Sequence, residues 1–259
     1  MVASMCGRYV SPEKEAIVER WPKVRCGCDG GWKPGFNVAP TTQVPILVQG
    51  GDGGMELRAA RWGLVPPWWT KDKPPAMTFN ARAEDAAQKP TWRDSLRTMR
   101  CLLPARGWYE WNPKEPAPDA AGRESGQPYF FFCPAEPVFA FAGIWSARER
   151  PGAAPLLSCA LLSTRAAPAI SSIHPRMPVV LPPENQIRWL DPSATPGEVQ
   201  ALLAAACTEF AAHPVSTRVN NVRNDAPGLM SPVPPPPSPA DTLCACKGAP
   251  CAYVISTLL

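Results

Sequence analysis

Short apolar segments, bounded by turn-forming residues, recur along most of the chain. Five of them are rich in β-branched or aromatic residues, and this composition predicts strands rather than helices. The predicted strands are V-P-I-L-V (44–48), Y-F-F-F-C (129–133), V-F-A-F-A-G-I-W (138–145), L-L-S-C-A-L-L (156–162) and M-P-V-V-L (177–181).

Helix-start signals are fewer. They predict a helix over 11–21, with Ser11 as N-cap and Pro12 at the first position, and two helices that begin with capping boxes, Thr91 to Asp94 and Thr195 to Glu198. Strands and helices do not alternate regularly, which disfavours a doubly wound parallel sheet. We therefore predict an α+β fold, with a mostly antiparallel, barrel-like β-sheet core and a few flanking helices.

Proline and glycine mark the loops and the boundaries of the domain. Two polar, Pro- and Gly-rich stretches, 26–35 and 112–128, are predicted to be loops. From Ser231 the chain continues as S-P-V-P-P-P-P-S-P and then becomes rich in cysteine, a composition that predicts a disordered tail. The expected organisation is a leader over 1–5, one catalytic domain over 6–230 and a tail over 231–259.

Composition narrows the class of protein. The 259 residues are 45% hydrophobic and 19% charged, as in a globular protein with a real core. A net charge of +4 permits a nucleic-acid partner without requiring one. Neither a membrane-spanning run nor a secretory signal core is present. The ten cysteines include Cys26-x-Cys28 and Cys244-x-Cys246, which lack zinc-ligand spacing, so we expect reduced thiols and no metal.

The start of the chain raises a chemical possibility. Cys6 follows Met5 in the stretch M-C-G-R-Y. If translation began at Met5 and this residue were removed, Cys6 would carry a free α-amine beside its thiol. Taken by itself, however, a small apolar residue in a first strand is the more economical interpretation of Cys6.

Other residues with catalytic potential are isolated along the chain. Glu110 lies among Trp108, Tyr109 and Trp111, and desolvation by aromatic rings raises the pKa of a carboxyl group. His174 precedes a proline, so its backbone is expected to be extended, and it is one of only two histidines. His213 is interpreted as structural. The tandem tryptophans at 68 and 69 would by themselves more often be packing residues.

Taken together, eight motifs in order over residues 5–224 resemble the SOS-response-associated peptidase family, whose members shield abasic sites in single-stranded DNA. The motifs are M-C-G-R-Y, F-N-V-A-P, R-W-G-L-V-P-P-W-W, F-N-A-R-A-E, P-A-R-G-W-Y-E-W, F-A-G-I-W, I-H-P-R-M-P and H-P-V-S. Two features depart from the family pattern, namely the four residues before Met5 and the tail from Ser231.

The resemblance implies roles for individual residues. By motif position, the catalytic residues are the nucleophile Cys6, the positioning residue Asn80, the acid/base carboxyl Glu110 and His174, which assists ring opening. Residues implied to contact DNA are Arg8 and Arg82 at phosphates, and Asn37, Pro40, Trp68 and Trp69 along the path of the strand. The implied partner is single-stranded DNA with abasic sites. We further expect no cofactor, no membrane contact, a monomer, and a cytoplasmic location in a bacterium or a nuclear one in a eukaryote.

The chemistry of an N-terminal cysteine fits this resemblance. A ring-opened abasic site exposes an aldehyde, and an α-amine with a pKa of about 7.7–8 condenses with it to an imine. The thiol then closes a thiazolidine ring. The family name also implies a peptidase that removes its own leader.

Two alternatives remain open from the sequence. The first is a glutamine amidotransferase of the N-terminal-nucleophile type, which also begins Met-Cys-Gly. The chain has no Asn-Gly dipeptide for the oxyanion turn of those enzymes, and Arg8 stands where they usually have an aliphatic residue. The second is a binding module with an inert cysteine.

Overall fold

A computed structural model of the protein describes residues 6–27, 31–71, 74–75, 77–119 and 122–234. The expected leader, Cys28, and the chain from residue 235 with Cys244, Cys246 and Cys251 lie outside the described residues.

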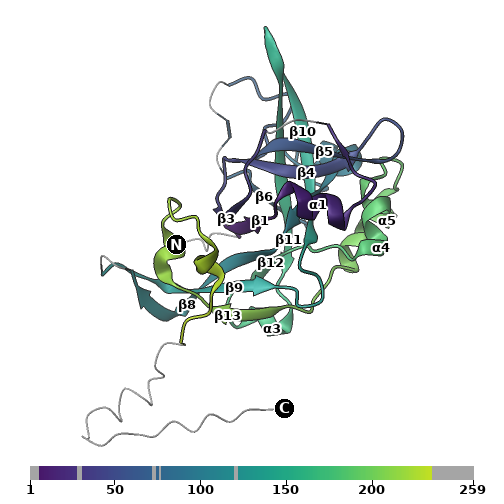
Figure 1. Ribbon diagram of the computed structural model, residues 1–259. Coiled ribbons are helices and arrows are strands. Elements are labelled where there is room, and N and C mark those ends of the chain that lie inside the picture. The colour runs from purple at the N-terminus through teal and green to yellow at the C-terminus, as the bar shows by residue number, and fades with distance from the viewer. Residues whose placement is uncertain (1–5, 28–30, 72–73, 76, 120–121, 235–259) are drawn as a thin grey trace, which may run out of the picture.

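The larger of two sheets closes into a barrel (Figure 1). Its order is β12-β11-β10-β7-β4-β5-β2, and a parallel pairing of Ser158 in β11 with Arg61 in β5 joins five of these strands into a ring. The bounds are β2 Arg25–Cys26, β4 Gln43–Gln49, β5 Met55–Trp62, β7 Arg100–Ala105, β10 Phe139–Arg150, β11 Ala153–Arg165 and β12 Arg176–Pro178. A short strand, β6 (Asn80–Arg82), pairs with β11.

A second sheet packs beside the barrel in the order β13-β9-β8-β1-β3. Its bounds are β1 Tyr9–Ser11, β3 Gly35–Val38, β8 Gly107–Pro118, β9 Glu124–Phe132 and β13 Ala211–Pro214. The two sheets share a buried aromatic cluster, in which Tyr9 meets Trp62 and Phe141 edge-to-face at centroid distances of 5.3 and 5.9 Å. The α+β class with a mostly antiparallel, barrel-like core is therefore confirmed, as are four of the five predicted strands. Of the fifth, over 177–181, only Met177 and Pro178 lie in a strand, and Val180 forms an isolated bridge with Phe141.

Short helices flank the sheets. They are α1 Lys14–Arg20, α2 Arg93–Thr98, α3 Pro168–Ser171, α4 Pro183–Leu190 and α5 Pro196–Ala204, with 3₁₀ turns η1 Thr217–Asn220 and η2 Pro227–Met230. The α4–α5 pair lies at one side of the barrel in Figure 1 and buries Trp189 in the core there. No helix within the described residues combines the length and apolarity that a membrane crossing requires.

Two of the three predicted helix starts are wrong. Ser11 does not cap a helix, because it ends β1 opposite Gly35, and α1 begins at Lys14 after Glu13. The box from Thr91 to Asp94 does not form either, since α2 follows a turn whose Lys89 carbonyl already accepts from the Arg93 N–H at 2.9 Å. The predicted box at α5 is confirmed, with Thr195 and Glu198 bonding each other's backbone N–H.

The predicted loop over 112–128 is also wrong in most of its length. It forms the outer part of the β8–β9 hairpin, in which Pro116 stands opposite Gly126 and Pro118 opposite Glu124. Prolines are tolerated there because β1 pairs with β8 only near Gly107 and Trp108, which leaves the outer half of β8 as a sheet edge. In the other predicted loop, 26–35, Cys26 ends β2 and Gly35 begins β3.

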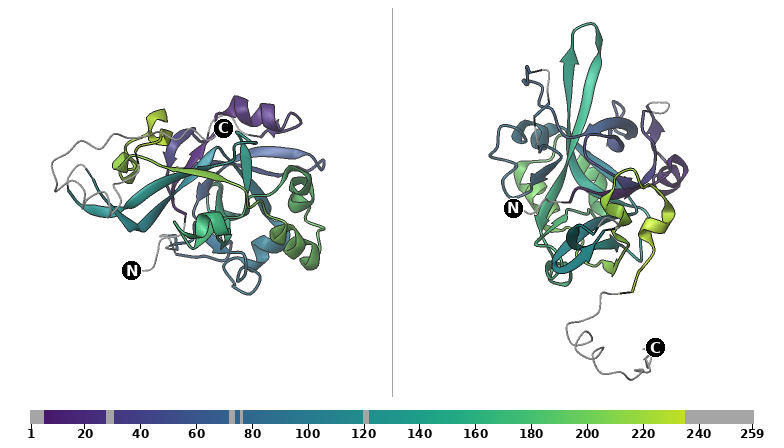
Figure 2. Two further views of the ribbon diagram at one scale, coloured as in Figure 1. Left: turned by 90° about the horizontal axis from the view of Figure 1, so that it is seen from below. Right: turned by 90° about the vertical axis from the view of Figure 1, so that its left-hand side faces the viewer.

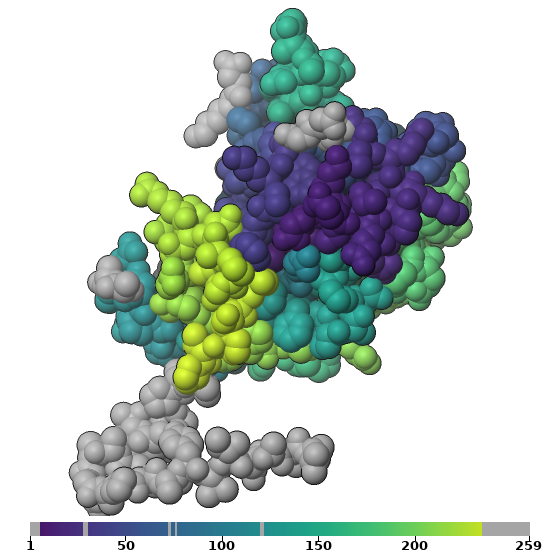
Figure 3. Space-filling model, viewed as in Figure 1, coloured from purple at the N-terminus to yellow at the C-terminus, as the bar shows by residue number. Residues whose placement is uncertain are grey.

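The last described segment covers one flank of the second sheet. Figure 3 shows this yellow-green segment against the purple N-terminal part of the chain, and the Phe36 N–H donates to the Asp225 carboxylate at 2.5 Å. Pairing continues past residue 230, since the Val233 N–H donates to the Pro214 carbonyl at 2.9 Å. On the opposite side, the β10–β11 hairpin projects well beyond the barrel (Figure 2).

Candidate active site

The site is built around Cys6, which lies just before β1 and is 1% exposed. The Asn80 side-chain NH₂ donates to the Cys6 carbonyl at 2.7 Å. Asn80 is held in turn by the pairing of β6 with β11, where it stands opposite Leu161. Two distant segments of the chain therefore meet at the backbone of the cysteine.

Glu110 reaches the same place from β8. The β1–β8 pairing brings it there, because the Tyr109 N–H donates to the Arg8 carbonyl at 3.0 Å. Burial raises the pKa of the Glu110 carboxyl well above its ordinary value, and the Cys6 thiol and backbone N–H, both directed at the carboxyl, offset this in part. The backbone nitrogen of Cys6 thus lies against a carboxyl group that burial favours in its protonated form.

The Cys6 thiol is protonated in this environment. Burial raises its pKa most, and Glu110, when it is ionised, adds to that effect. Its Sγ lies 3.9 Å from the Arg8 carbonyl oxygen. Because the thiolate is the reactive form of cysteine, a buried thiol of this kind must give up its proton to a neighbouring acceptor as it reacts.

His174 completes the group, from the loop between α3 and β12. Its Nδ1 lies 2.9 Å from the Arg176 carbonyl oxygen and 3.8 Å from Oε1 of Glu110. The Arg176 N–H also lies 3.3 Å from Nδ1, but the shorter contact is with the carbonyl oxygen, which only accepts, so this contact favours the hydrogen on Nδ1 and the lone pair on Nε2. Burial lowers the pKa of the imidazole, so the pair is best described as a protonated carboxyl beside a neutral histidine.

Three polar atoms of this group lack a hydrogen-bond partner among the described residues. They are Oδ1 of Asn80, Oε1 of Glu110 and Nε2 of His174, all buried. Buried polar atoms in native proteins are nearly always paired. Three such atoms on side chains grouped near one cysteine indicate a site that a polar ligand completes.

Arg176 and Glu84 hold the histidine loop in place, a role that the sequence analysis missed. The Arg176 guanidinium forms two bonds of 2.7 and 3.0 Å with Glu84 and donates to the Ser163 carbonyl at 2.6 Å. It therefore ties the loop of His174 to β11 and to the end of β6. Glu84 belongs to the motif of Asn80 and Arg176 to the motif of His174, and this membership could have identified them from the sequence.

The residues expected to contact DNA fall into two groups. Arg8 and Arg82 are near the candidate catalytic residues along the chain, because Arg8 follows Cys6 by two residues and Arg82 follows Asn80 by two residues on β6. Arg82 is exposed, while Arg8 is partly buried with its guanidinium 6.0 Å from the Trp111 ring centroid.

Trp68, Trp69, Pro40 and Asn37 lie on other segments. Trp68 is 52% exposed and its ring centroid lies 6.1 Å from that of Trp69. Asn37 is buried, and its NH₂ donates to the carbonyls of residues 219, 221 and 224 at 3.0–3.1 Å. That NH₂ therefore holds the fold together.

His213 has a structural bond as expected, between Nε2 and the Met230 carbonyl at 2.7 Å.

The structure gives no candidate metal site in the part of the chain that it describes, because no three His, Cys, Asp or Glu side chains cluster suitably. The site instead consists of a thiol, a carboxyl, an imidazole and an amide.

Fold and site together define a protein with a buried cysteine at the junction of a β-barrel and a second sheet, next to a buried carboxyl–histidine pair. The model of the SOS response associated peptidase family matches residues 5–222. The chain belongs to this family.

Curated relatives agree with the assignment, and a solved structure shares the fold. The chain is 34% identical to the abasic site processing protein YoqW of Bacillus subtilis over 232 residues, covering 87% of this chain and 99% of that protein. It is 31% identical to the abasic site processing protein HMCES of Gallus gallus, covering 79% and 68%. A crystal structure of a protein from Bacteroides thetaiotaomicron shares the fold, with a TM-score of 0.72 at 21% identity, covering 88% of this chain and all of that one.

Proposed function

We propose that the protein processes abasic sites in single-stranded DNA by capturing them covalently through Cys6. The observation that carries the proposal is that Asn80, Glu110 and His174 gather around one cysteine and that each has a buried polar atom without a partner among the described residues. The names of the relatives support the choice of an abasic site as the substrate.

The active form begins at Cys6 in this proposal. Met5 is removed after initiation, or the protein cleaves its own leader, which would be its peptidase activity. The freed α-amine then replaces the backbone N–H that faces Glu110. An amine with a pKa of about 7.7–8 is partly neutral at physiological pH and attacks the lesion.

Capture proceeds in three steps, which are opening of the sugar, formation of an imine and closure of the thiazolidine ring. His174 takes the proton of the sugar hydroxyl at Nε2 while Glu110 protonates the ring oxygen, which opens the sugar to its aldehyde. The amine adds to the aldehyde carbon, and water leaves to give an imine. The S–H of Cys6 then adds across the C=N bond, with sulfur on carbon and the proton on nitrogen, to close a thiazolidine ring. One water is lost overall.

The remaining residues position the strand. Arg8 and Arg82 face the flanking phosphates, and Trp68, Trp69, Pro40 and Asn37 border the path of the bases. Aromatic stacking tolerates any base, as a lesion-directed protein requires. A stacked duplex hides the aldehyde, so single strands are the preferred substrate. The domain over 6–230 acts as a monomer in this proposal.

The test is adduct formation between protein that begins at Cys6 and a single-stranded oligonucleotide with one abasic site. Intact mass should equal the sum of the two molecules less one water. Cys6→Ser and a form that retains Met5 should give no stable adduct, because an oxygen ring is less stable and an amide nitrogen does not condense. Equal yield from Cys6→Ser would rule out the thiazolidine, and glutamine hydrolysis without an adduct would point to an amidotransferase.

A further inference from the structure

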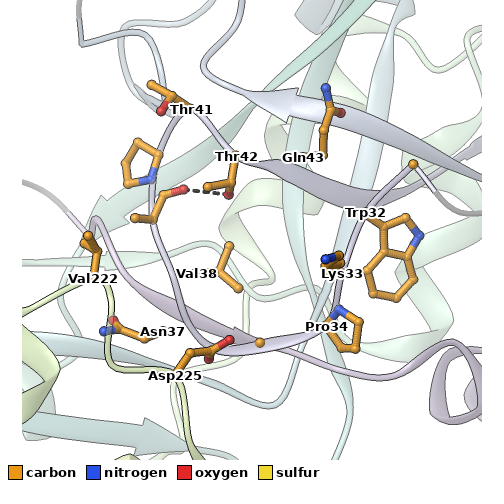
Figure 4. A pocket seen from close by; sticks show the side chains of 14 residues that line it. Trp32, Lys33, Pro34, Asn37, Val38, Thr41, Thr42, Gln43, Val222 and Asp225 are labelled. Atoms are coloured by element: carbon orange, nitrogen blue, oxygen red, sulfur yellow. Dashed lines mark hydrogen bonds between the residues drawn. The ribbon is translucent and has the colours of Figure 1, made fainter.

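A cavity of about 670 Å³ opens beside β3 and contains none of the four proposed catalytic residues (Figure 4). Residues 31–35 form one wall, residues 39–43 form another, and Val222 and Asp225 close the third side. Its volume lies within the range of small-ligand sites. Neither the fold nor the proposed chemistry at Cys6 requires a hollow of this size.

Two features of the lining indicate a ligand. Thr41 has a φ of 77°, in the left-handed region that a β-branched residue rarely adopts, and such strain collects at functional sites. Asn37 has a buried Oδ1 without a partner among the described residues. The three bonds of its NH₂ prevent the amide from turning round. The cavity therefore combines a strained wall with an unused hydrogen-bond acceptor.

The chemistry of the walls fits an unpaired nucleobase. Trp32 is half-buried, packs partly against the core and lines the cavity. Lys33 is exposed and forms no ion pair within the described residues. A flat aromatic ring next to a free cation is the combination that single-strand binders use for a base and its phosphate.

The cavity is also within reach of a strand held at Cys6. β1 and β3 run antiparallel, with Tyr9 opposite Val38. The chain after Val38 therefore runs toward the Cys6 end of β1. Thr41 and Cys6 each lie three residues beyond the pair, and the chain turns at residues 40–42, so the wall over residues 39–43 and the cysteine follow the same end of the β1–β3 pair.

We propose that this cavity, lined by Trp32, Lys33, Asn37 and Thr41, holds one unpaired base of the strand beside the lesion. The base stacks on Trp32, a base N–H group donates to Asn37, and Lys33 neutralises the adjoining phosphate. The inference rests on the proposed function, since the lesion at Cys6 sets the register of the strand. It adds a base subsite in a cavity to the path along Trp68 and Trp69.

The test is a competition for covalent capture by protein that begins at Cys6. Two labelled oligonucleotides carry the same abasic aldehyde, and in one of them a single flanking nucleotide is replaced by a stable baseless spacer that keeps its phosphate. The aldehyde fixes the register. A spacer at one position within about three nucleotides of the lesion should lower capture roughly 5- to 150-fold, the scale of one stacked base.

Variants connect that position to the cavity. The spacer ratio is the capture of the complete oligonucleotide divided by the capture of the one with the spacer. Trp32→Ala should bring this ratio close to one, whereas Trp32→Phe, which keeps a stacking ring, should preserve most of it. Trp145→Ala is the matched control, because Trp145 is also half-buried but lines a different cavity with Gln49 and Arg100. Lys33→Gln should reduce the salt dependence of binding by about one phosphate contact.

The outcomes separate this inference from the proposed function. If wild-type protein forms no adduct with any abasic strand, the proposed function fails. If it forms the adduct but the spacer scan is flat, or Trp32→Ala leaves the ratio unchanged, the base subsite is wrong and the capture chemistry stands. The scan on wild-type protein does not depend on the folding of any variant, and thermal melting checks the variants.

Discussion

Replacing Glu110 with glutamine should slow capture of abasic DNA and stabilise the fold at the same time. Glu110 is 1% exposed, and its Oε1 has no hydrogen-bond partner among the described residues. Glutamine keeps the shape of the side chain but neither ionises nor gives up a proton. This one substitution therefore reports separately on the contribution of the carboxyl to the rate of capture and on its effect on the stability of the fold.

The sign of the stability effect follows from burial. The folded-state pKa of Glu110 is raised above its ordinary value of 4.5. Below pH 4.5 the carboxyl is protonated in both the folded and the unfolded state, so its ionisation does not affect stability. As pH rises from 4.5 toward the folded-state pKa, only the unfolded state ionises, and wild-type stability falls by about 1.4 kcal/mol per pH unit. Glutamine does not ionise, so the variant does not lose stability in this way as the pH rises. Removing one acid/base group should slow the chemistry by about 10- to 10³-fold.

Two assays measure the two effects. Urea unfolding between pH 4 and pH 8, on protein that retains Met5, should show a gap in stability between Glu110→Gln and wild type that opens with pH. Single-turnover crosslinking at saturating DNA, on protein that begins at Cys6, gives the rate. Glu209→Gln, a change at an exposed carboxylate, should alter neither. In protein that begins at Cys6 the gap should narrow, because the α-amine provides a positive partner for Glu110.

Either of two results would refute this reasoning. A wild-type rate at saturating DNA combined with weaker binding would make Glu110 a contact rather than an acid. A difference in stability between variant and wild type that does not change with pH would mean that burial does not raise the pKa of Glu110 in the folded state.

Other changes test the remaining parts of the structure. His174→Ala should slow single-turnover crosslinking by about 10- to 10³-fold with little change in DNA affinity; a loss of affinity alone would contradict the assignment. Arg82→Ala should weaken binding and its salt dependence, measured by fluorescence anisotropy at several salt concentrations, and keep the rate at saturation. Thr41→Gly should raise thermal stability by about 1 kcal/mol, since glycine adopts the left-handed backbone without strain; a lower melting temperature would contradict this. Truncation after Pro234 should leave the crosslinking yield within about twofold, because Pro-rich chain adds little to a sheet, and a large loss on a gel would place part of the working domain beyond that residue.

The sequence alone determined the class of fold and the identity of the four residues proposed for catalysis. Strand segments such as 44–48 and 156–162 were predictable because apolar, β-branched runs between turn residues are a local signal. The capping box at Thr195 was predictable for the same reason, since its partners lie three residues apart. Cys6, Asn80, Glu110 and His174 were identified through their motifs, whose order along the chain is visible without any structure.

What only the tertiary structure decided depends on residues that are distant in sequence. Ser11 became a strand residue because Gly35 lies opposite it, and the Pro-rich stretch after Asn112 became a hairpin because β9 was there to pair with it. The tautomer favoured for His174 depends on the contact of its Nδ1 with the Arg176 carbonyl, which is shorter than the contact with the Arg176 N–H. Local patterns record the preferences of neighbouring residues, whereas pairing, burial and the pKa of Glu110 arise when separate strands exclude water from the same small volume.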